Sequence, residues 1–363
     1  MKEFLKQEKS ILISLLSLAV LIPLEHTILA SSVFNLLALS AVFMIIMYSA
    51  LTVAHHAEAL AEKYGEPYGT MILTLSAVVV EVLIIGIMMA HSANINLARD
   101  TIVAAIILDI NGLLGIAAII GGIKHGVQDY NINSTNSFIS MIIVAVGISM
   151  VMPIFIDEQW QESYLIFLAI LFVIMFVIFT RVQIKEHNYF FQYGYKRKTA
   201  QQYDTHLSHK KINGFYHACM LIIAIVLIGF LSELLSVFMS LSLSNSGLPI
   251  ALGALAVAII SASPELITAI KSAVENRMQT VINIALGASL ATVLLTIPAM
   301  IALSLITHHD INFALNPIQI TLLIITFWVS VIHFNDGKSN VLEGAIHFIL
   351  FIVFLFFMFT GQI

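Results

Sequence analysis

Two glutamates, Glu81 and Glu265, lie in the middle of long apolar runs, at 68–90 and 248–271. A carboxylate at bilayer depth costs at least about 2.5 kcal/mol, so it is usually retained for a function. Carboxylate oxygens bind both protons and hard cations, and the two compete for the same atoms. Two such residues in corresponding positions therefore indicate a site that exchanges cations for protons. The alternative is structural, with each glutamate paired to a helix dipole or to a nearby cation such as Lys271.

Other oxygens close to the two glutamates could complete a cation site. Pro264 directly precedes Glu265 and removes a backbone donor, so we expect that helix to be kinked or broken there. Carbonyls released by such a break are good ligands for a hard cation where they line a cavity. Because these ligands are oxygens rather than clustered Cys and His, they favour Ca²⁺, Na⁺ or H⁺ over zinc or copper. The candidate supporting ligands are Asn111, Asn283, Ser261, Ser263, Ser289 and Thr292, together with Asp109, which either binds the ion or supports Asn111.

The composition requires a membrane protein. Of 363 residues, 60% are hydrophobic and only 10% are charged, whereas soluble domains carry roughly 25% charged residues. Helices satisfy their backbone groups within one segment, so the sequence predicts an all-α polytopic protein. We expect about eleven transmembrane helices, near 10–30, 32–54, 68–90, 101–121, 137–156, 163–182, 215–240, 248–271, 279–304, 316–334 and 341–360.

The basic residues predict the orientation of these helices. If the N-terminus is cytoplasmic, all but one of the 16 Lys and Arg residues fall in cytoplasmic segments, and Arg99 is the exception. Such a bias is the positive-inside signature of a bacterial-type plasma (inner) membrane protein. With eleven spans the C-terminus then lies outside.

The spans divide into two candidate repeats. We assign 1–30 to an N-terminal segment and first helix, 31–182 to a first five-helix repeat, 183–214 to a cytoplasmic basic linker, and 215–363 to a second repeat. An offset of five spans is odd, so equivalent helices cross in opposite directions, as in many secondary transporters. The glutamates lie in the second helix of each half, and the third helices share an Asn-x3-Gly pattern, at 111–115 and 283–287.

The stretches 65–83, 261–270 and 283–299 resemble the two alpha-repeats of the cation/Ca²⁺ exchanger superfamily, most closely the bacterial ChaA-type Na⁺(Ca²⁺)/H⁺ antiporters. The resemblance implies alternating access around one acidic residue per repeat, which would be Glu81 and Glu265, with Asn111 and Asn283 as supporting groups. It also implies that the second and seventh helices slide past a core made of the third, fourth, eighth and ninth. The Gly-Asn-Ala-x-Glu motif of vacuolar Ca²⁺/H⁺ exchangers is absent, so the choice among Ca²⁺, Na⁺ and K⁺ stays open.

We therefore expect a secondary active antiporter that exports Ca²⁺, with Na⁺ or K⁺ as alternatives, in exchange for H⁺. Neither a P-loop nor a cofactor motif is present, so we expect no cofactor, no catalytic residue and no nucleic-acid partner; its partners would be the bilayer, the transported cations and protons. The oligomeric state stays open. The alternatives are a channel or uniporter without proton coupling, an intramembrane hydrolase, or a scaffold or receptor. A hydrolase of the zinc type would need a motif such as His-Glu-x-x-His, whereas His55, His56 and Glu58 fall in an expected cytoplasmic connection.

Overall fold

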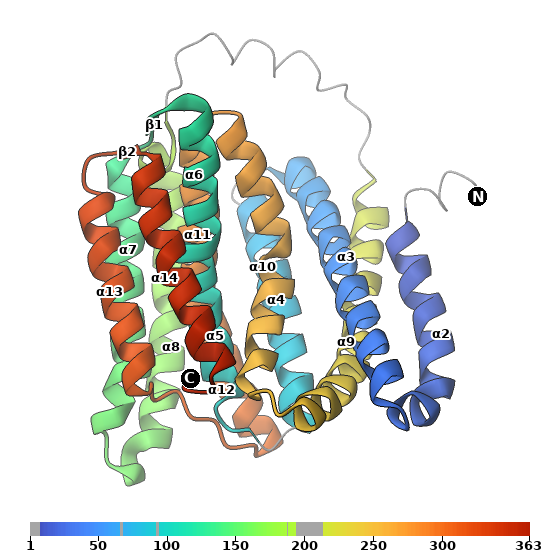
Figure 1. The fold of residues 1–363 in the computed structure, drawn as a ribbon. Helices are drawn as coiled ribbons and strands as arrows, with labels where there is room; N and C mark the ends of the chain where they lie inside the picture. Colours follow the sequence, from blue (N-terminus) through green and yellow to red (C-terminus); the bar gives the residue numbers. More distant parts are fainter. Residues whose placement is uncertain (1–7, 66–67, 92–93, 187, 194–212) are drawn as a thin grey trace.

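A computed structural model describes residues 8–65, 68–91, 94–186, 188–193 and 213–363. Most of the expected basic linker, at 194–212, lies outside these residues. The described chain forms a single bundle of long apolar helices (Figure 1). Ten helical spans have 18 or more residues and α13 is a shorter apolar helix, which confirms the expected eleven spans. The helices are α2 (Lys9–Leu29), α3 (Ser32–Tyr64), α4 (Tyr68–His91), α5 (Leu97–Ile107), α6 (Leu114–His125), α7 (Ile132–Val146), α8 (Glu158–Arg181), α9 (Gly214–Ser246), α10 (Ala251–Val274), α11 (Met278–Ala291), α12 (Ile297–Thr307), α13 (Pro317–His333) and α14 (Val341–Phe359).

Several spans contain a turn of another helical type. Two of the four π-helical segments in the described residues join α-helices within one span: η1 (Leu108–Leu113) joins α5 to α6, and η7 (Thr292–Thr296) joins α11 to α12. A π turn inserts one extra residue and re-aims the side chains around it, and such turns are frequent at functional sites. The remaining short elements are η2 (Gly147–Val151), η3 (Met152–Phe155), η4 (Val182–Glu186) and η5 (Asn188–Phe191), with strands β1 (Gln128–Asp129) and β2 (Lys338–Ser339).

Helix ends follow local sequence signals. Asn131, Asn213, Asn316 and Asn340 each cap a helix, with the side-chain oxygen accepting a backbone N–H of the first turn, as asparagine commonly does. One expected end is wrong, because α3 continues well past residue 54 to Tyr64 and ends only at Gly65, whose φ is +64°. Hydropathy marks where a helix leaves lipid and not where it stops. His55, His56 and Glu58 therefore lie on helix α3 rather than in a connecting loop.

The helices recur at one spacing along the chain. The pairs α3 and α9, α4 and α10, α5 and α11, α7 and α13, and α8 and α14 begin 181–185 residues apart, and α2 has no counterpart. Glu265 follows Glu81 by 184 residues, and η7 follows η1 by the same 184. This common offset supports the predicted pair of five-helix repeats at 31–182 and 215–363. The division stays a prediction, and α2 is then an addition to it.

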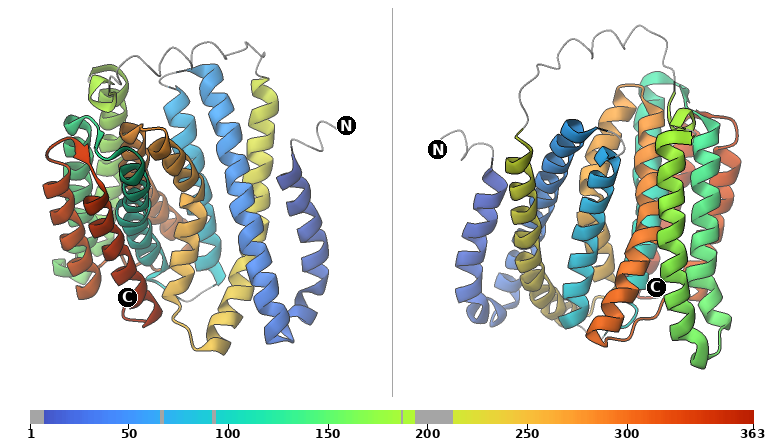
Figure 2. Two further views of the ribbon diagram at one scale, coloured as in Figure 1. Left: turned by 45° about the horizontal axis from the view of Figure 1, so that its top comes forward. Right: turned by 180° about the vertical axis from the view of Figure 1, so that it is seen from behind.

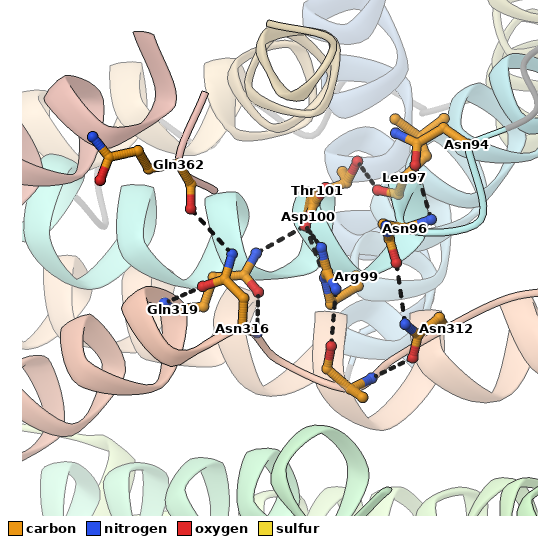
Figure 3. Close-up of polar contacts among 11 residues, drawn as sticks. Asn94, Asn96, Leu97, Arg99, Asp100, Thr101, Asn312, Asn316, Gln319 and Gln362 are labelled. Atoms are coloured by element: carbon orange, nitrogen blue, oxygen red, sulfur yellow. Dashed lines mark hydrogen bonds and ion pairs between the residues drawn. The ribbon is translucent and has the colours of Figure 1, made fainter. Parts of the chain in front are cut away.

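A buried polar cluster joins α5 to the start of α13 (Figure 3). Gln319 Nε2 donates to Asp100 Oδ1 at 2.8 Å, and Arg99 Nε donates to the same oxygen at 2.9 Å. Arg99 Nη1 also donates to the carbonyl of Ala314 at 2.9 Å. The one basic residue expected outside is therefore buried and paired. A similar link joins α11 to α7, where Gln279 Nε2 donates to Ser134 Oγ at 2.9 Å.

Two groups of helices lie at opposite edges of the bundle, and a pair of helices lies between them. In Figures 1 and 2, α2, α3 and α9 lie at one edge, α7, α8 and α13 lie at the other, and α4 and α10 lie between them. The pairs α2 and α3, α2 and α9, and α3 and α9 all pack together. α3 and α9 are 33 residues each, about 50 Å at the usual helical rise, so they exceed the roughly 30 Å hydrocarbon core.

Candidate cation-binding site

A cavity of about 400 Å³ lies between α3, α4, α8, α10 and α11. Glu81, Asp109 and Glu265 line it, and it extends to Glu58 and Thr268 near helix ends. Those are the ends of α3, α8 and α10 that also carry the basic residues Lys63, Arg181 and Lys271. The cavity therefore leads from the middle of the bundle toward the end that the sequence predicts to be cytoplasmic.

Glu81 is held on one side of the cavity by two threonines from η7. It is the fourteenth of 24 residues in α4, and only 3% of its surface is exposed. Its Oε2 accepts hydrogen bonds from Thr296 Oγ1 at 2.7 Å and from Thr292 Oγ1 at 3.3 Å. Both threonines belong to the π segment, a type of turn that is frequent at functional sites. Its other oxygen, Oε1, is buried and has no hydrogen-bond partner among the described residues.

Glu265 faces the same cavity from α10, where it is the fifteenth of 24 residues. Its Oε2 is likewise buried without a partner in the described part of the chain. The expected break at Pro264 does not occur, because α10 runs continuously through it. Ser263 Oγ donates to the carbonyl of Ile260 at 2.8 Å and so satisfies the acceptor that proline leaves without its usual donor. Neither Ile260 nor Ser263 is among the residues that line the cavity.

Asp109 is a third carboxylate at the cavity, and it comes from η1. Only 3% of its surface is exposed, and its Oδ2 accepts a hydrogen bond from Ser289 Oγ at 3.1 Å. It interacts electrostatically with both Glu81 and Glu265. Three carboxylates of the same sign thus line one cavity. Such an arrangement is costly unless protons or cations neutralise it.

Among the other expected ligands, Ser261 and Asn283 line the cavity and Ser289 reaches it through Asp109. Ser261 Oγ donates to the carbonyl of Ala258 at 3.1 Å. Asn283 Nδ2 donates to the carbonyl of Phe191 at 2.8 Å, and Asn283 Oδ1 accepts from Gln279 at 2.8 Å. The Asn283 amide is thus already engaged, and it lies on the route into the site rather than beside the glutamates.

Asn111 faces away from the cavity. Its Nδ2 donates to Thr326 Oγ1 at 2.7 Å, and its Oδ1 lies 2.8 Å from His347 Nδ1, so that α13 and α14 hold η1 from behind. Gly115, on the same face, lets α6 touch α14, because a Cβ there would lie 2.9 Å from the backbone nitrogen of Phe348. Asn111 therefore positions the segment that carries Asp109.

The two Asn-x3-Gly patterns therefore have different roles, because Asn283 lines the cavity whereas Asn111 contacts α13 and α14. Asn283 follows Asn111 by 172 residues, whereas the glutamates and the π segments are offset by 184. The patterns are out of register with the helical repeat, and their likeness does not mark equivalent positions.

Thr296 contacts Glu81 but is not among the ligands predicted from the sequence. It follows Thr292 by four residues, so both hydroxyls could be placed on one helical face. This spacing was the available signal, but only the structure shows that the face meets Glu81.

The geometry suits a hard cation. Glu81 Oε1 and Glu265 Oε2 are buried oxygens without donors, Asp109 adds a third carboxylate, and Ser261 adds a neutral oxygen at the cavity wall. Carboxylate and neutral oxygens are the ligands preferred by Ca²⁺ and related ions. No group of three or more His, Cys, Asp and Glu residues poised to hold a metal ion occurs among the described residues, so the site is an open cavity and not a preformed metal cage.

Comparison with known proteins gives a consistent result. A putative ionic transporter, y4hA, from Sinorhizobium fredii is 32% identical over 308 residues, which cover 83% of each chain. The sodium-potassium/proton antiporter ChaA from Escherichia coli is 29% identical over 358 residues, 98% of this chain and 97% of that one.

Solved structures share the fold. The structure of native YfkE matches with a TM-score of 0.73 at 18% identity and covers 96% of this chain and 99% of that one. The H⁺/Ca²⁺ exchanger CAX matches with a TM-score of 0.67 at 18% identity, over 98% of this chain and 89% of that one. The sequence profile described as sodium/calcium exchanger protein matches residues 32–185 and 216–360, which together make up most of the chain. The chain therefore belongs to the sodium/calcium exchanger family, within the ChaA-like part of the cation/Ca²⁺ exchanger superfamily.

Proposed function

We propose that this transporter is a cation/proton antiporter that exports Ca²⁺, with Na⁺ or K⁺ as alternative cargo, in exchange for protons. The observation that carries the proposal is the pair of unpartnered buried oxygens, Glu81 Oε1 and Glu265 Oε2, on two residues that line one cavity. The relatives named as antiporters of Na⁺, K⁺ or Ca²⁺ against H⁺ support the same class of activity.

Proton coupling follows from the shared oxygens. A buried carboxylate is stable when it is protonated or when it contacts a cation, and the two partners exclude each other. Two protons exchanged for one divalent cation would leave the net charge of the glutamate pair unchanged. Asp109, which Ser289 already hydrogen-bonds, adds a charge that favours divalent over monovalent cargo, because Coulomb attraction scales with ion charge.

The direction of transport rests on the orientation. We place the chain in the plasma membrane with the N-terminus cytoplasmic, because nearly all Lys and Arg residues then lie inside. The cavity opens at that same end, so the structure would be the state that receives cytoplasmic cations. Alternating access would require α3 and α9 to slide relative to α4, α5, α10 and α11.

The test is cation-driven proton movement in everted membrane vesicles. Ca²⁺, Na⁺ and K⁺ are added separately to vesicles that hold a respiration-generated pH gradient. The wild type should dissipate the gradient for at least one ion, whereas Glu81→Gln and Glu265→Gln should not. Glu233→Gln is a matched control, because Glu233 also lies in a membrane helix but is exposed and pairs with His91 at 3.8 Å, away from the cavity.

Two results would contradict the proposal. Full activity in both glutamine variants would mean that the glutamates are structural. Cation flux that continues unchanged after the pH gradient is collapsed would instead favour a channel or uniporter. An intramembrane hydrolase is no longer a competing explanation, since the family consists of exchangers.

A further inference from the structure

A second buried cluster of titratable side chains includes His56 on α3, and none of its members lines the cavity. Glu8, just before α2, is 2% exposed, and His56 on α3 is 1% exposed. His56 Nε2 lies 3.2 Å from Glu8 Oε2, and His56 Nδ1 lies 2.9 Å from His217 Nδ1 on α9. Tyr216 Oη donates to the other oxygen of Glu8. Four side chains thus join α2, α3 and α9 at one end of the bundle.

The contact between the two histidines limits how many protons the cluster can hold. In an Nδ1···Nδ1 hydrogen bond one nitrogen donates and the other must offer its lone pair. The pair therefore accommodates two neutral imidazoles or one imidazolium, but not two imidazolium ions. When both rings are protonated, two N–H groups face each other and the contact opens.

The surrounding charges do not remove this limit. Glu8 stabilises a charge on His56, and the exposed His55 adds a third imidazole, with its ring centre 5.5 Å from His56 and 6.3 Å from His217. Lys63 of α3 lies beside Gly214 at the start of α9, so it opposes a second positive charge nearby. Tyr216 offers Glu8 a neutral donor that does not depend on histidine. The one carboxylate of the cluster can balance one imidazolium.

The cluster adjoins the wall of the ion cavity. Ala57 and Glu58, the next two residues after His56, line the cavity near its open end. The same end of α2 also has contacts to α3 that need no proton, because Ser10 and Ser14 contact Ser49 through buried hydroxyls at 3.2 and 2.8 Å. Loss of the histidine contact would therefore loosen α3 at the cavity mouth without detaching α2.

We propose that Glu8, His56, His217 and Tyr216 form a proton-operated latch that holds the ends of α2, α3 and α9 together at high cytoplasmic pH and opens between α3 and α9 on acidification. Its placement in the cytoplasm rests on the proposed orientation and function. Release slows transport, and this suits an exchanger that imports protons, because continued exchange would acidify the cytoplasm further. It also gives α2, which lies outside the two repeats, a regulatory role.

The transport test uses everted vesicles, whose cytoplasmic face meets the medium. His217→Asn keeps a neutral hydrogen-bonding group beside His56 but removes the second imidazolium. Histidine changes charge between about pH 5 and 8, so the rate of the variant should equal the wild-type rate near pH 8 and exceed it by about threefold or more near pH 6. His55→Asn, a neighbouring histidine outside the hydrogen-bonded chain, should follow the wild type. Acidifying the medium of right-side-out vesicles should not separate the variants.

A second readout does not need transport. Cys219, the single cysteine, is partly exposed on α9, two residues after His217. Near pH 6 a maleimide should label Cys219 about threefold faster in the wild type and in His55→Asn than in His217→Asn, and near pH 8 the three rates should agree, because local opening exposes the thiol. Comparing chains at one pH cancels the intrinsic effect of pH on thiol reactivity.

The outcomes separate the two proposals. Equal labelling rates for the three chains at both pH values would overturn the latch proposal. The proposal would also be overturned if acidification lowered the transport rates of the wild type and of His217→Asn by the same factor. A difference seen only when the opposite membrane face is acidified would overturn its cytoplasmic placement. If no chain moves cations but labelling behaves as expected, the antiporter proposal fails and the latch stands.

Discussion

The Thr296 hydroxyl is expected to set how well cations compete with protons at Glu81. It is fully buried and donates to Glu81 Oε2 at 2.7 Å. A hydrogen bond to a charged group contributes about 1.5–3 kcal/mol, and this bond favours the carboxylate, which is the form that binds a cation. Thr296→Val removes the donor and keeps the side-chain shape. At 1.4 kcal/mol per factor of ten, the apparent KM for the cation should rise about ten- to hundredfold near neutral pH.

The assay is the initial rate of cation-driven proton movement in everted vesicles, measured over a range of cation concentrations at neutral and alkaline pH. The increase in KM should shrink at alkaline pH, because protons then no longer compete for Glu81. Thr296→Ser retains the hydroxyl and should stay close to the wild type. Thr292→Val should have a smaller effect than Thr296→Val, since its hydroxyl lies 3.3 Å from the same oxygen.

The reasoning would be refuted by a normal KM in Thr296→Val at neutral pH. It would also be refuted by an increase of the same size at both pH values, which would indicate distortion of the site and not proton competition. A larger effect of Thr292→Val would show that the two distances do not rank the contacts.

Three further changes probe the site, its entrance and its support. Asp109→Asn should raise the KM for both ions, and the factor for Ca²⁺ should be at least about ten times the factor for Na⁺, because the lost attraction scales with ion charge. Equal factors for the two ions would show that Asp109 does not select by charge. Glu58→Gln at the cavity mouth should raise the KM about two- to threefold at low ionic strength only, and an effect that survives high salt would contradict an attraction at long range. Gly115→Val places a side chain against the α14 backbone, 2.9 Å from Phe348 N, and should lower stability by about 1–3 kcal/mol, which thermal unfolding in detergent measures; Gly147→Val, where a Cβ meets open space, is its control.

The sequence predicts the spans well because lipid imposes a simple rule on long apolar segments. Each of the eleven expected spans corresponds to a helical span of the structure. This rule does not predict helical segments that are polar and continue beyond an apolar span. The end of α3 from Ala54 to Tyr64 is rich in polar residues, yet it stays helical until Gly65 changes the backbone direction. This extension carries His56, one of the four residues of the proposed latch.

Side-chain partners are harder to predict, because they depend on contacts between distant segments. Glu81 and Glu265 stand out by the cost of a carboxylate in an apolar helix, and both reach the cavity. Asn111 has the same kind of local signal, but packing against α14 and α13 turns it away. Pro264 has a strong local tendency to disrupt a helix, which the neighbouring Ser263 hydroxyl offsets. Nothing in the sequence alone marks the π turns at η1 and η7.

Those π turns make the two halves chemically unequal at equivalent places. η1 contributes the carboxylate of Asp109, whereas η7 contributes the hydroxyls of Thr292 and Thr296, and both hydroxyls donate to Glu81. The glutamates are therefore not interchangeable ligands, although they share a 184-residue offset. Glu81 has donors that hold one oxygen in place, while Glu265 Oε2 has no partner in the described residues. In the proposed mechanism, Glu81 Oε1 and Glu265 Oε2 would each find a partner in the transported cation or in a proton, and this choice would be the step at which the two fluxes become coupled.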